Sequence, residues 1–167
     1  MTKEYKIIEE NLDKEITRFV NESKVEYITD GSSKKLTYSE FLSDKILIIN
    51  AIRNGIPYSL FHAIQDYTPF SESDWAKLLN ISTKSLQRYK QSEKHAFKSL
   101  QSEKIIAMAE VTKIGLDVFD DLEQFKLWLN TPNFALGNNK PIELLTDSYG
   151  KELVVSELIR VQHGIMV

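Results

Sequence analysis

The sequence predicts an all-α protein, a helical bundle with a central helix-turn-helix unit and a helical C-terminal domain. Apolar residues recur three and four positions apart through most of the 167 residues, which is the spacing of a helix with one buried face. Helix-capping residues stand before several of these stretches. With 6 Gly and 4 Pro the chain is poor in turn residues, and no alternation of strand and helix patterns is visible.

The first third of the chain contains two predicted helices with a break between them. Residues 4–21 have the helical spacing, whereas residues 25–36 are rich in turn formers. Within that break, residues 25–28 are predicted to form a short extended piece. A second helix is expected from about Ser39 to the stop signal at Asn54-Gly55, since Gly commonly follows a helix end.

Three short helices are predicted in the middle of the chain. Pro57 opens the first, because Pro is tolerated in a first turn, and Pro69 ends it. Ser71 followed three residues later by an acid is a capping-box pattern for a helix over 72–79. The third helix covers residues 83–91.

The C-terminal third contains four more helical segments and a loop. They are a helix from Ser102 to about Ile114 with apolar spacing resuming to Phe119, a helix from about 122 to 129, a loop over 131–137, a one-turn helix over 141–145, and a last helix over about 149–163. Trp128 and Phe134 are expected to hold the loop against the core. In the last helix, Val154, Leu158 and Val161 are expected to face inward.

Charge is distributed unevenly. The net charge is -3 and the pI is about 5.7, which by themselves argue against a nucleic-acid partner. Residues 1–81 hold 13 acids and 10 bases, residues 82–114 hold 3 acids and 7 bases, and residues 115–167 hold 8 acids and 4 bases. A short basic segment therefore lies inside an acidic protein, and such asymmetry is a better guide to partners than the total charge.

The stretch from Glu72 to Gln91 has the spacing of a bacterial helix-turn-helix, which it resembles position by position. Ala76 is the small residue of the first helix, and Asn80 takes the place of the usual turn Gly. Asn accepts the left-handed conformation that this turn needs. The apolar positions are Trp75, Leu79, Ile81, Leu86 and Tyr89.

The second helix of this unit is the candidate recognition helix. Its outward residues belong to the types that bond to base edges and phosphates, and we predict that they bind DNA. They are Thr83, Lys84, Ser85, Gln87, Arg88 and Gln91. A homodimer reading two half-sites is expected. The alternative is a helical hairpin that packs and binds nothing.

Three segments of the C-terminal part form a distinctive pattern: WLNTPNFALG over 128–137, KPIELL over 140–145 and LIRVQHGIMV over 158–167. With these segments, the C-terminal part resembles the toxin-binding domain of the Xre/MbcA/ParS-type antitoxins. The helix-turn-helix stands where this family has it, so the resemblance covers roughly residues 55–167. The predicted domains are an N-terminal helical region (1–54), a helix-turn-helix region (55–101) and a toxin-binding domain (102–167).

The resemblance implies an antitoxin of a type II toxin–antitoxin system. Its partners would be a RES-domain toxin, which consumes NAD or transfers ADP-ribose from it, and the operator DNA of its own operon. The C-terminal region would cover or enter the active-site cleft of the toxin. The residues expected at that interface are Arg160, His163, Gly164, Ile165, Met166 and Val167.

Enzymatic readings find little support in the sequence. The chain has no Cys, its 3 His are scattered, and it lacks a P-loop, a Gly-x-Gly-x-x-Gly motif and a nucleophile elbow. Asp120 and Asp121 are explained as helix caps. We therefore expect no catalytic residue, metal or cofactor, and a cytoplasmic protein without a membrane segment.

Two other functions stay open at this point. One is a stand-alone helix-turn-helix transcriptional regulator without a toxin, and the other is a purely structural dimerisation module. The motifs do not explain residues 1–54, for which dimerisation or capping of the helical core is expected.

Overall fold

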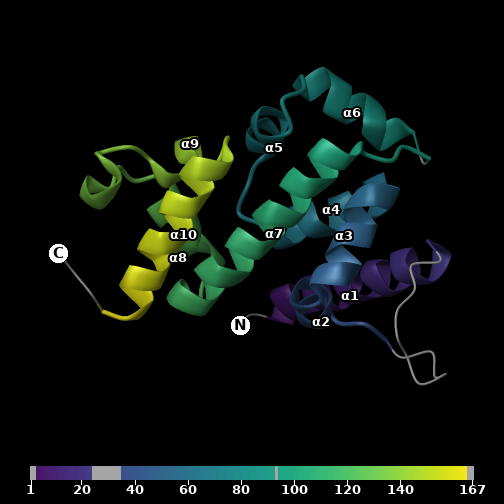
Figure 1. Cartoon of the computed structure of the whole chain (residues 1–167), viewed down its shortest axis with the longest axis horizontal. Helices are drawn as coiled ribbons and strands as arrows, with labels where there is room; N and C mark the ends of the chain where they lie inside the picture. Colours follow the sequence, from purple (N-terminus) through teal and green to yellow (C-terminus); the bar gives the residue numbers. More distant parts are fainter. Residues whose placement is uncertain (1–2, 24–34, 93, 165–167) are drawn as a thin grey trace. The chain divides into compact units, whose positions relative to one another are not determined.

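The computed structural model describes residues 3–23, 35–92 and 94–164, and these residues form helices joined by turns and loops (Figure 1). No β-strand is present among the described residues, which confirms the all-α prediction. The extended piece predicted over 25–28 lies outside the described residues. The chain divides into two compact units, residues 1–67 with 83–107 and residues 68–82 with 108–167.

The helices of the first unit are α1 (Lys3–Glu22), α2 (Tyr38–Ser43), α3 (Lys45–Asn54), α4 (Tyr58–Tyr67), α6 (Thr83–Gln91) and the first nine residues of α7 (Ser99–Phe119). The second unit contains α5 (Glu72–Leu78), the rest of α7, α8 (Leu122–Leu129), the 3-10 helix η1 (Phe134–Leu136), α9 (Pro141–Leu144) and α10 (Ser148–Gln162).

The core of the first unit forms where α1 packs against α4. Leu12 and Ile16 of α1 are fully buried, as are Leu60 and Phe61 of α4. These residues follow the spacing of three and four that predicted both helices, and their burial supplies most of the stability of an amphipathic helix.

The single helix expected from Ser39 to Asn54 is wrong, because the chain breaks at Asp44. This residue has an extended backbone with φ -96° and ψ 98°, and it ends α2 and caps α3 at once. Its carboxylate accepts a hydrogen bond of 3.0 Å from the backbone N–H of Leu47. Asp competes with the helix in this way because its short side chain satisfies backbone donors that a helix start leaves open.

The start of α4 is held by the segment that follows α6. The N–H of Phe97 donates to the carbonyl of Ile56 at 2.8 Å, and the N–H of Tyr58 donates to the carbonyl of His95 at 2.9 Å. Gly55 allows this approach: it has φ +85°, and a Cβ there would lie 2.6 Å from the carbonyl oxygen of Phe97. Pro57 precedes the first residue of α4 rather than lying within it, which corrects the predicted start.

The second unit has an aromatic cluster and a longer α7 than predicted. α7 begins at Ser99 and continues to Phe119, beyond the predicted end near Ile114. Phe119, Phe125 and Trp128 lie with ring centroids 5.8 to 6.2 Å apart. Trp128 therefore lies against the fully buried Phe125, and its predicted contact with the core is confirmed.

Two expected core positions of this unit are wrong. Phe134 is 84% exposed. The buried residue of η1 is Leu136, and in this single turn Phe134 is left facing solvent. Val161 is 36% exposed near the end of α10, whereas Val154 and Leu158 are fully buried as predicted. Gly150 brings α10 against the carbonyl of Leu144, where a side chain would collide.

The helix start at Asp120-Asp121 uses only one of the two acids as a cap. Asp121 accepts a 2.9 Å hydrogen bond from the N–H of Gln124, whereas Asp120 adopts a left-handed conformation with φ +53° at the end of α7.

Among the residues that the structure describes, no helix has the length and apolar character needed to span a bilayer.

Candidate nucleic-acid interface and C-terminal surface

The first helix of the predicted helix-turn-helix is α5, and its start is a capping box. The hydroxyl of Ser71 accepts a 3.1 Å hydrogen bond from the N–H of Asp74, and the carboxylate of Asp74 accepts one of 2.9 Å from the N–H of Ser71. This reciprocal pair satisfies two backbone donors, as the spacing predicted. Trp75 and Ala76 are buried on the inner side of this helix.

The turn after α5 closes around Asn80. This residue has φ +53°, in the left-handed region, and its N–H donates to the carbonyl of Lys77 at 3.1 Å. The next N–H, of Ile81, donates to the carbonyl of Ala76 at 3.0 Å. These two bonds form a Schellman motif, which ends a helix and redirects the chain. The role predicted for Asn80 at the turn is confirmed.

The second helix, α6, presents a polar and basic face. It carries three basic residues and no acid in nine positions. Five of the six predicted DNA-binding residues are exposed, and Ser85 is half-buried. Lys84, Arg88 and Gln91 are spaced four and three apart, so they form one row along the helix. Contact of these residues with DNA remains a prediction.

Two features anchor α6. Leu86 is its one fully buried residue, with 2% of its surface exposed. The ring of Tyr89 stacks on that of His95, with centroids 3.6 Å apart and planes 8° apart. The guanidinium of Arg88 lies 5.7 Å from the centre of the Tyr89 ring, within cation–π range.

His95 lies in an environment that disfavours its protonation. Burial lowers its pKa from the ordinary value, and the nearby charge of Arg88 lowers it further. Its Nε2 atom is buried and makes no hydrogen bond with the described residues. A neutral imidazole is therefore favoured beneath the basic face.

Three exposed lysines run from the last turn of α6 into the segment that follows it. Lys90, Lys94 and Lys98 are all exposed. Lysine is a flexible point charge suited to phosphate contacts, whose strength depends on salt. The three lysines thus add positive charge to the solvent-facing surface of the first unit.

The exposed side of α10 is the principal surface of the predicted C-terminal interface. Arg160 donates a 3.1 Å hydrogen bond from Nη1 to the carboxylate of Glu157. His163 ends the helix and is exposed, as is Gly164 with φ +66°. On the inner side, Lys151 pairs with Glu110 of α7 at 3.2 Å.

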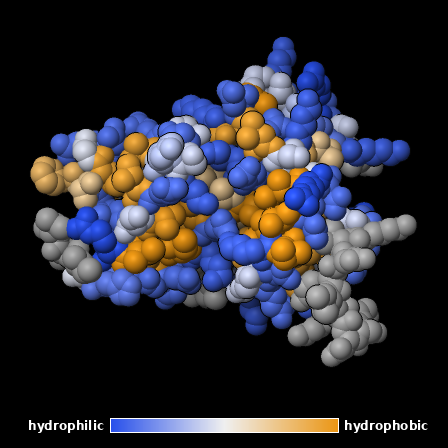
Figure 2. Space-filling view, in the orientation of Figure 1, coloured by the Kyte–Doolittle hydropathy of each residue, from blue (hydrophilic) through white to orange (hydrophobic). Residues whose placement is uncertain are grey.

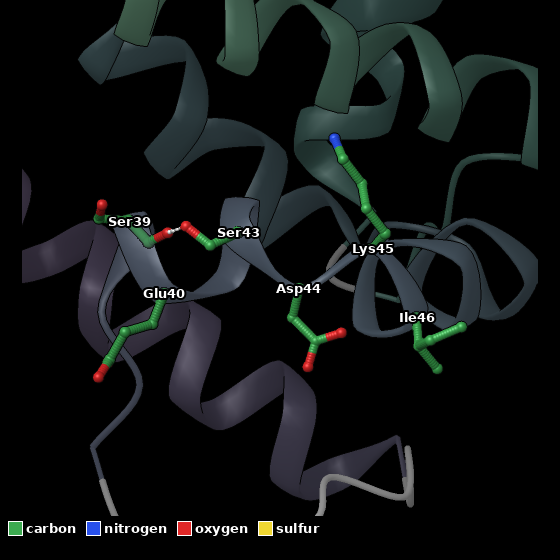
Figure 3. Close-up of a pocket in the computed structure, with 6 residues that line it drawn as sticks. All are labelled: Ser39, Glu40, Ser43, Asp44, Lys45 and Ile46. Carbon is green, nitrogen blue, oxygen red and sulfur yellow. Dashed lines mark hydrogen bonds between the residues drawn. The ribbon is translucent and has the colours of Figure 1, made fainter.

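A shallow hollow of about 630 Å³ lies beside α2 and α3 in the first unit (Figure 3). The carboxylates of Glu40 and Asp44 point to one side of it and Lys45 points to the other (Figure 3). Its polar groups serve the fold: Ser43 donates to the carbonyl of Ser39 at 2.7 Å, and Glu40 accepts from the N–H of Thr37 at 2.9 Å. Within the described residues, no group of three His, Asp or Glu side chains is placed to hold a metal ion.

Comparison with protein families identifies the family to which the chain belongs. Residues 48–110 match the antitoxin Xre-like helix-turn-helix domain. Residues 115–164 match the antitoxin Xre/MbcA/ParS C-terminal toxin-binding domain. The chain belongs to the Xre-type antitoxins. No curated protein matches it.

Membership of this family implies a toxin partner, DNA binding and a regulatory role for the antitoxin. Its domain order also agrees with the structure, since α5 and α6 lie inside the first match and α8 to α10 lie inside the second. Arg160, His163 and Gly164 fall within the second match, whereas Ile165, Met166 and Val167 lie beyond both that match and the described residues.

Sequence reasoning missed the exposure of several large apolar residues in the antitoxin's second unit, including three on η1 and α10. Phe134, Tyr149 and Leu153 are 84%, 81% and 55% exposed. Their spacing gives a partial signal, because Tyr149 and Leu153 share a face of α10 with Arg160. The spacing gives no signal for Phe134, because the exposure of that side chain depends on the hydrogen bonds that close the loop around η1.

Proposed function

We propose that this antitoxin neutralises a RES-domain toxin, an enzyme that consumes NAD or transfers ADP-ribose from it. The toxin-binding family match over residues 115–164 is the observation that carries the proposal. The RES assignment rests on the resemblance of the 128–137 loop and the 158–167 segment described above. The proposed interface comprises Arg160, His163, Gly164, Ile165, Met166 and Val167.

Arg160 is suited to take a second partner in this complex. A guanidinium carries five N–H donors, and the bond to Glu157 uses one of them. Among the described residues no other bond of Arg160 is present, which leaves donors for a carboxylate in the toxin cleft, where a charge-assisted bond is stronger than a neutral one. The apolar residues that follow would then enter the cleft and exclude NAD.

We further propose that a homodimer of the antitoxin represses its own operon through α6. The exposed basic face of that helix supports this, as does the family match over residues 48–110. A dimer would read two half-sites about one turn of DNA apart. Both activities would place the protein in the cytoplasm.

Co-expression with the product of the neighbouring gene, which the proposal expects to be a RES toxin, tests the first proposal. The wild-type chain should restore growth of cells that express the toxin. Deletion of residues 165–167, or Arg160→Glu, should abolish that rescue while circular dichroism shows that the helical fold is intact. Lys126→Glu, at an exposed position of α8, is a matched charge-reversal control and should still rescue.

The outcomes separate the functions. Full rescue by the deletion variant and by Arg160→Glu would overturn the proposed interface. Operator binding by a chain that never neutralises the toxin would instead favour a stand-alone transcriptional regulator.

A further inference from the structure

The second unit exposes large apolar side chains on two adjoining elements. Phe134 is on η1, Tyr149 and Leu153 are on α10, and η1 contacts α10. Figure 2 shows apolar side chains at the surface over this part of the chain. Large apolar side chains exposed on adjoining elements are a mark of an interaction site.

Tyr149 and Leu153 form a stripe on the outer side of α10. They are four residues apart, and Arg160 lies seven residues further along, so all three fall on one face. Val154 and Leu158, which are fully buried, turn the opposite face of the helix toward the core. The exposed stripe is therefore fixed by the packing of the helix.

Phe134 is held outward by a closed loop. The side chain of Asn133 accepts a 2.9 Å hydrogen bond from the N–H of Ala135, and its backbone N–H donates to the carbonyl of Asn139 at 3.1 Å. The N–H of Asn138 returns to the carbonyl of Asn133 at 2.9 Å. Since Leu136 is buried, the loop presents Phe134 to solvent in a defined position. A preorganised side chain loses less freedom on binding than a mobile one.

We propose that Phe134, Tyr149 and Leu153 form the docking surface that supplies most of the affinity of the antitoxin for its toxin, so that docking and blocking of the cleft are separate tasks. The inference rests on the proposed function. Aromatic side chains at interfaces carry a disproportionate share of binding energy, and two of the three residues are aromatic. All three lie inside the matched toxin-binding domain.

Charge favours the toxin, rather than a second copy of this chain, as the occupant. Residues 115–167 hold 8 acids and 4 bases. An enzyme that binds NAD must attract an anionic pyrophosphate, so its cleft and surroundings are expected to be basic. An acidic domain with an apolar centre complements that surface, whereas two acidic copies repel each other.

Isothermal titration of the purified full-length antitoxin into the RES toxin tests the proposal. Phe134→Ala, Tyr149→Ala and Leu153→Ala are each expected to raise the Kd about tenfold or more, in line with interface hot spots. Circular dichroism and the melting temperature should not change, because the side chains are exposed. Tyr149→Phe should bind as wild type, since the ring supplies the contact.

Matched controls come from the first unit. Ile49→Ala and Leu100→Ala also remove exposed apolar side chains, 40% and 80% exposed, and should leave the Kd unchanged. Deletion of residues 165–167 should leave the Kd within a few fold while inhibition of NAD turnover is lost. That result would show docking without blocking.

The outcomes distinguish the two proposals. If the wild-type chain does not bind the RES toxin, the proposed function fails. If it binds and the three alanine variants bind equally well, the docking surface is overturned. If those variants instead split a wild-type homodimer on gel filtration and keep their Kd for the toxin, the surface belongs to a second copy, which also overturns the proposal.

Discussion

The exposed face of α6 and the exposed face formed by η1 and α10 differ in the kind of side chain they offer a partner. α6 presents Lys84 and Arg88 among polar residues, without an acid in the helix. The other face presents Phe134, Tyr149 and Leu153 in an acidic part of the chain. The first is suited to a polyanion through salt-dependent contacts, and the second to a protein surface through apolar burial.

The two faces also differ in how they are held. α6 has one fully buried residue, Leu86, and the stacked pair Tyr89 and His95. α10 has Gly150, Val154 and Leu158 buried along its length. One chain thus contains a lightly anchored polar helix and a firmly anchored apolar surface, and substitutions should affect them differently.

Leu86→Ala should have the largest effect. It removes the one fully buried side chain of α6, and Leu-to-Ala changes in cores cost about 2–5 kcal/mol. Urea denaturation followed by circular dichroism measures the loss. The matched control is Leu100→Ala, 80% exposed in the same unit, which should change the free energy of unfolding by less than about 0.5 kcal/mol. Equal losses in both would show that Leu86 does not anchor α6.

The second-largest effect should be weaker operator binding by the variants Lys84→Ala and Arg88→Ala. A lost bidentate base contact of Arg88 would cost about 1–3 kcal/mol, and a lost phosphate contact of Lys84 would lower the slope of log affinity against log salt by about 0.9. Fluorescence anisotropy with operator DNA at several salt concentrations measures both. Arg53→Ala, an exposed arginine of α3, is the control. Unchanged affinity and slope would favour the hairpin that binds nothing.

Asn80→Ala, in the turn between α5 and α6, should lower the free energy of unfolding by a smaller amount. Asn80 has φ +53°, and the left-handed conformation costs most L-residues about 1–2 kcal/mol, a penalty that Asn partly avoids. We expect a loss of about 1 kcal/mol for Ala and no loss for Asn80→Gly, since Gly adopts this conformation freely. Thermal denaturation compares the two. A less stable Gly variant would mean that the Asn side chain itself is needed.

The pH dependence contributed by His95 should be the smallest effect. Burial lowers its pKa below the ordinary 6.5, and Arg88 lowers it further. The unfolded chain then binds the proton more tightly, so stability rises with pH up to about 6.5 and falls as the pH drops below that value. His95→Phe keeps the stacked ring and removes the titration. Between about pH 7 and pH 5 it should lose less stability than wild type, whereas His163→Gln, at an exposed position, should follow wild type.

Much of the fold follows from signals that act within a few residues. The capping box at Ser71 and Asp74 forms as its spacing predicted, and Asn80 occupies the left-handed turn position. Both depend on hydrogen bonds to neighbouring backbone groups. The same kind of signal was available at Asp44, but the apolar spacing across it favoured one continuous helix and concealed the break.

The sequence by itself determined the helical class, most of the helix positions, the helix-turn-helix spacing and the family of this chain, because periodicity, caps and motif spacing are local properties. Only the tertiary structure decided that Phe134 and Val161 face solvent and that His95 stacks on Tyr89. Burial depends on which distant segments cover a side chain. Phe134 looks like a core residue in the sequence, and the closed loop around Asn133 turns it outward.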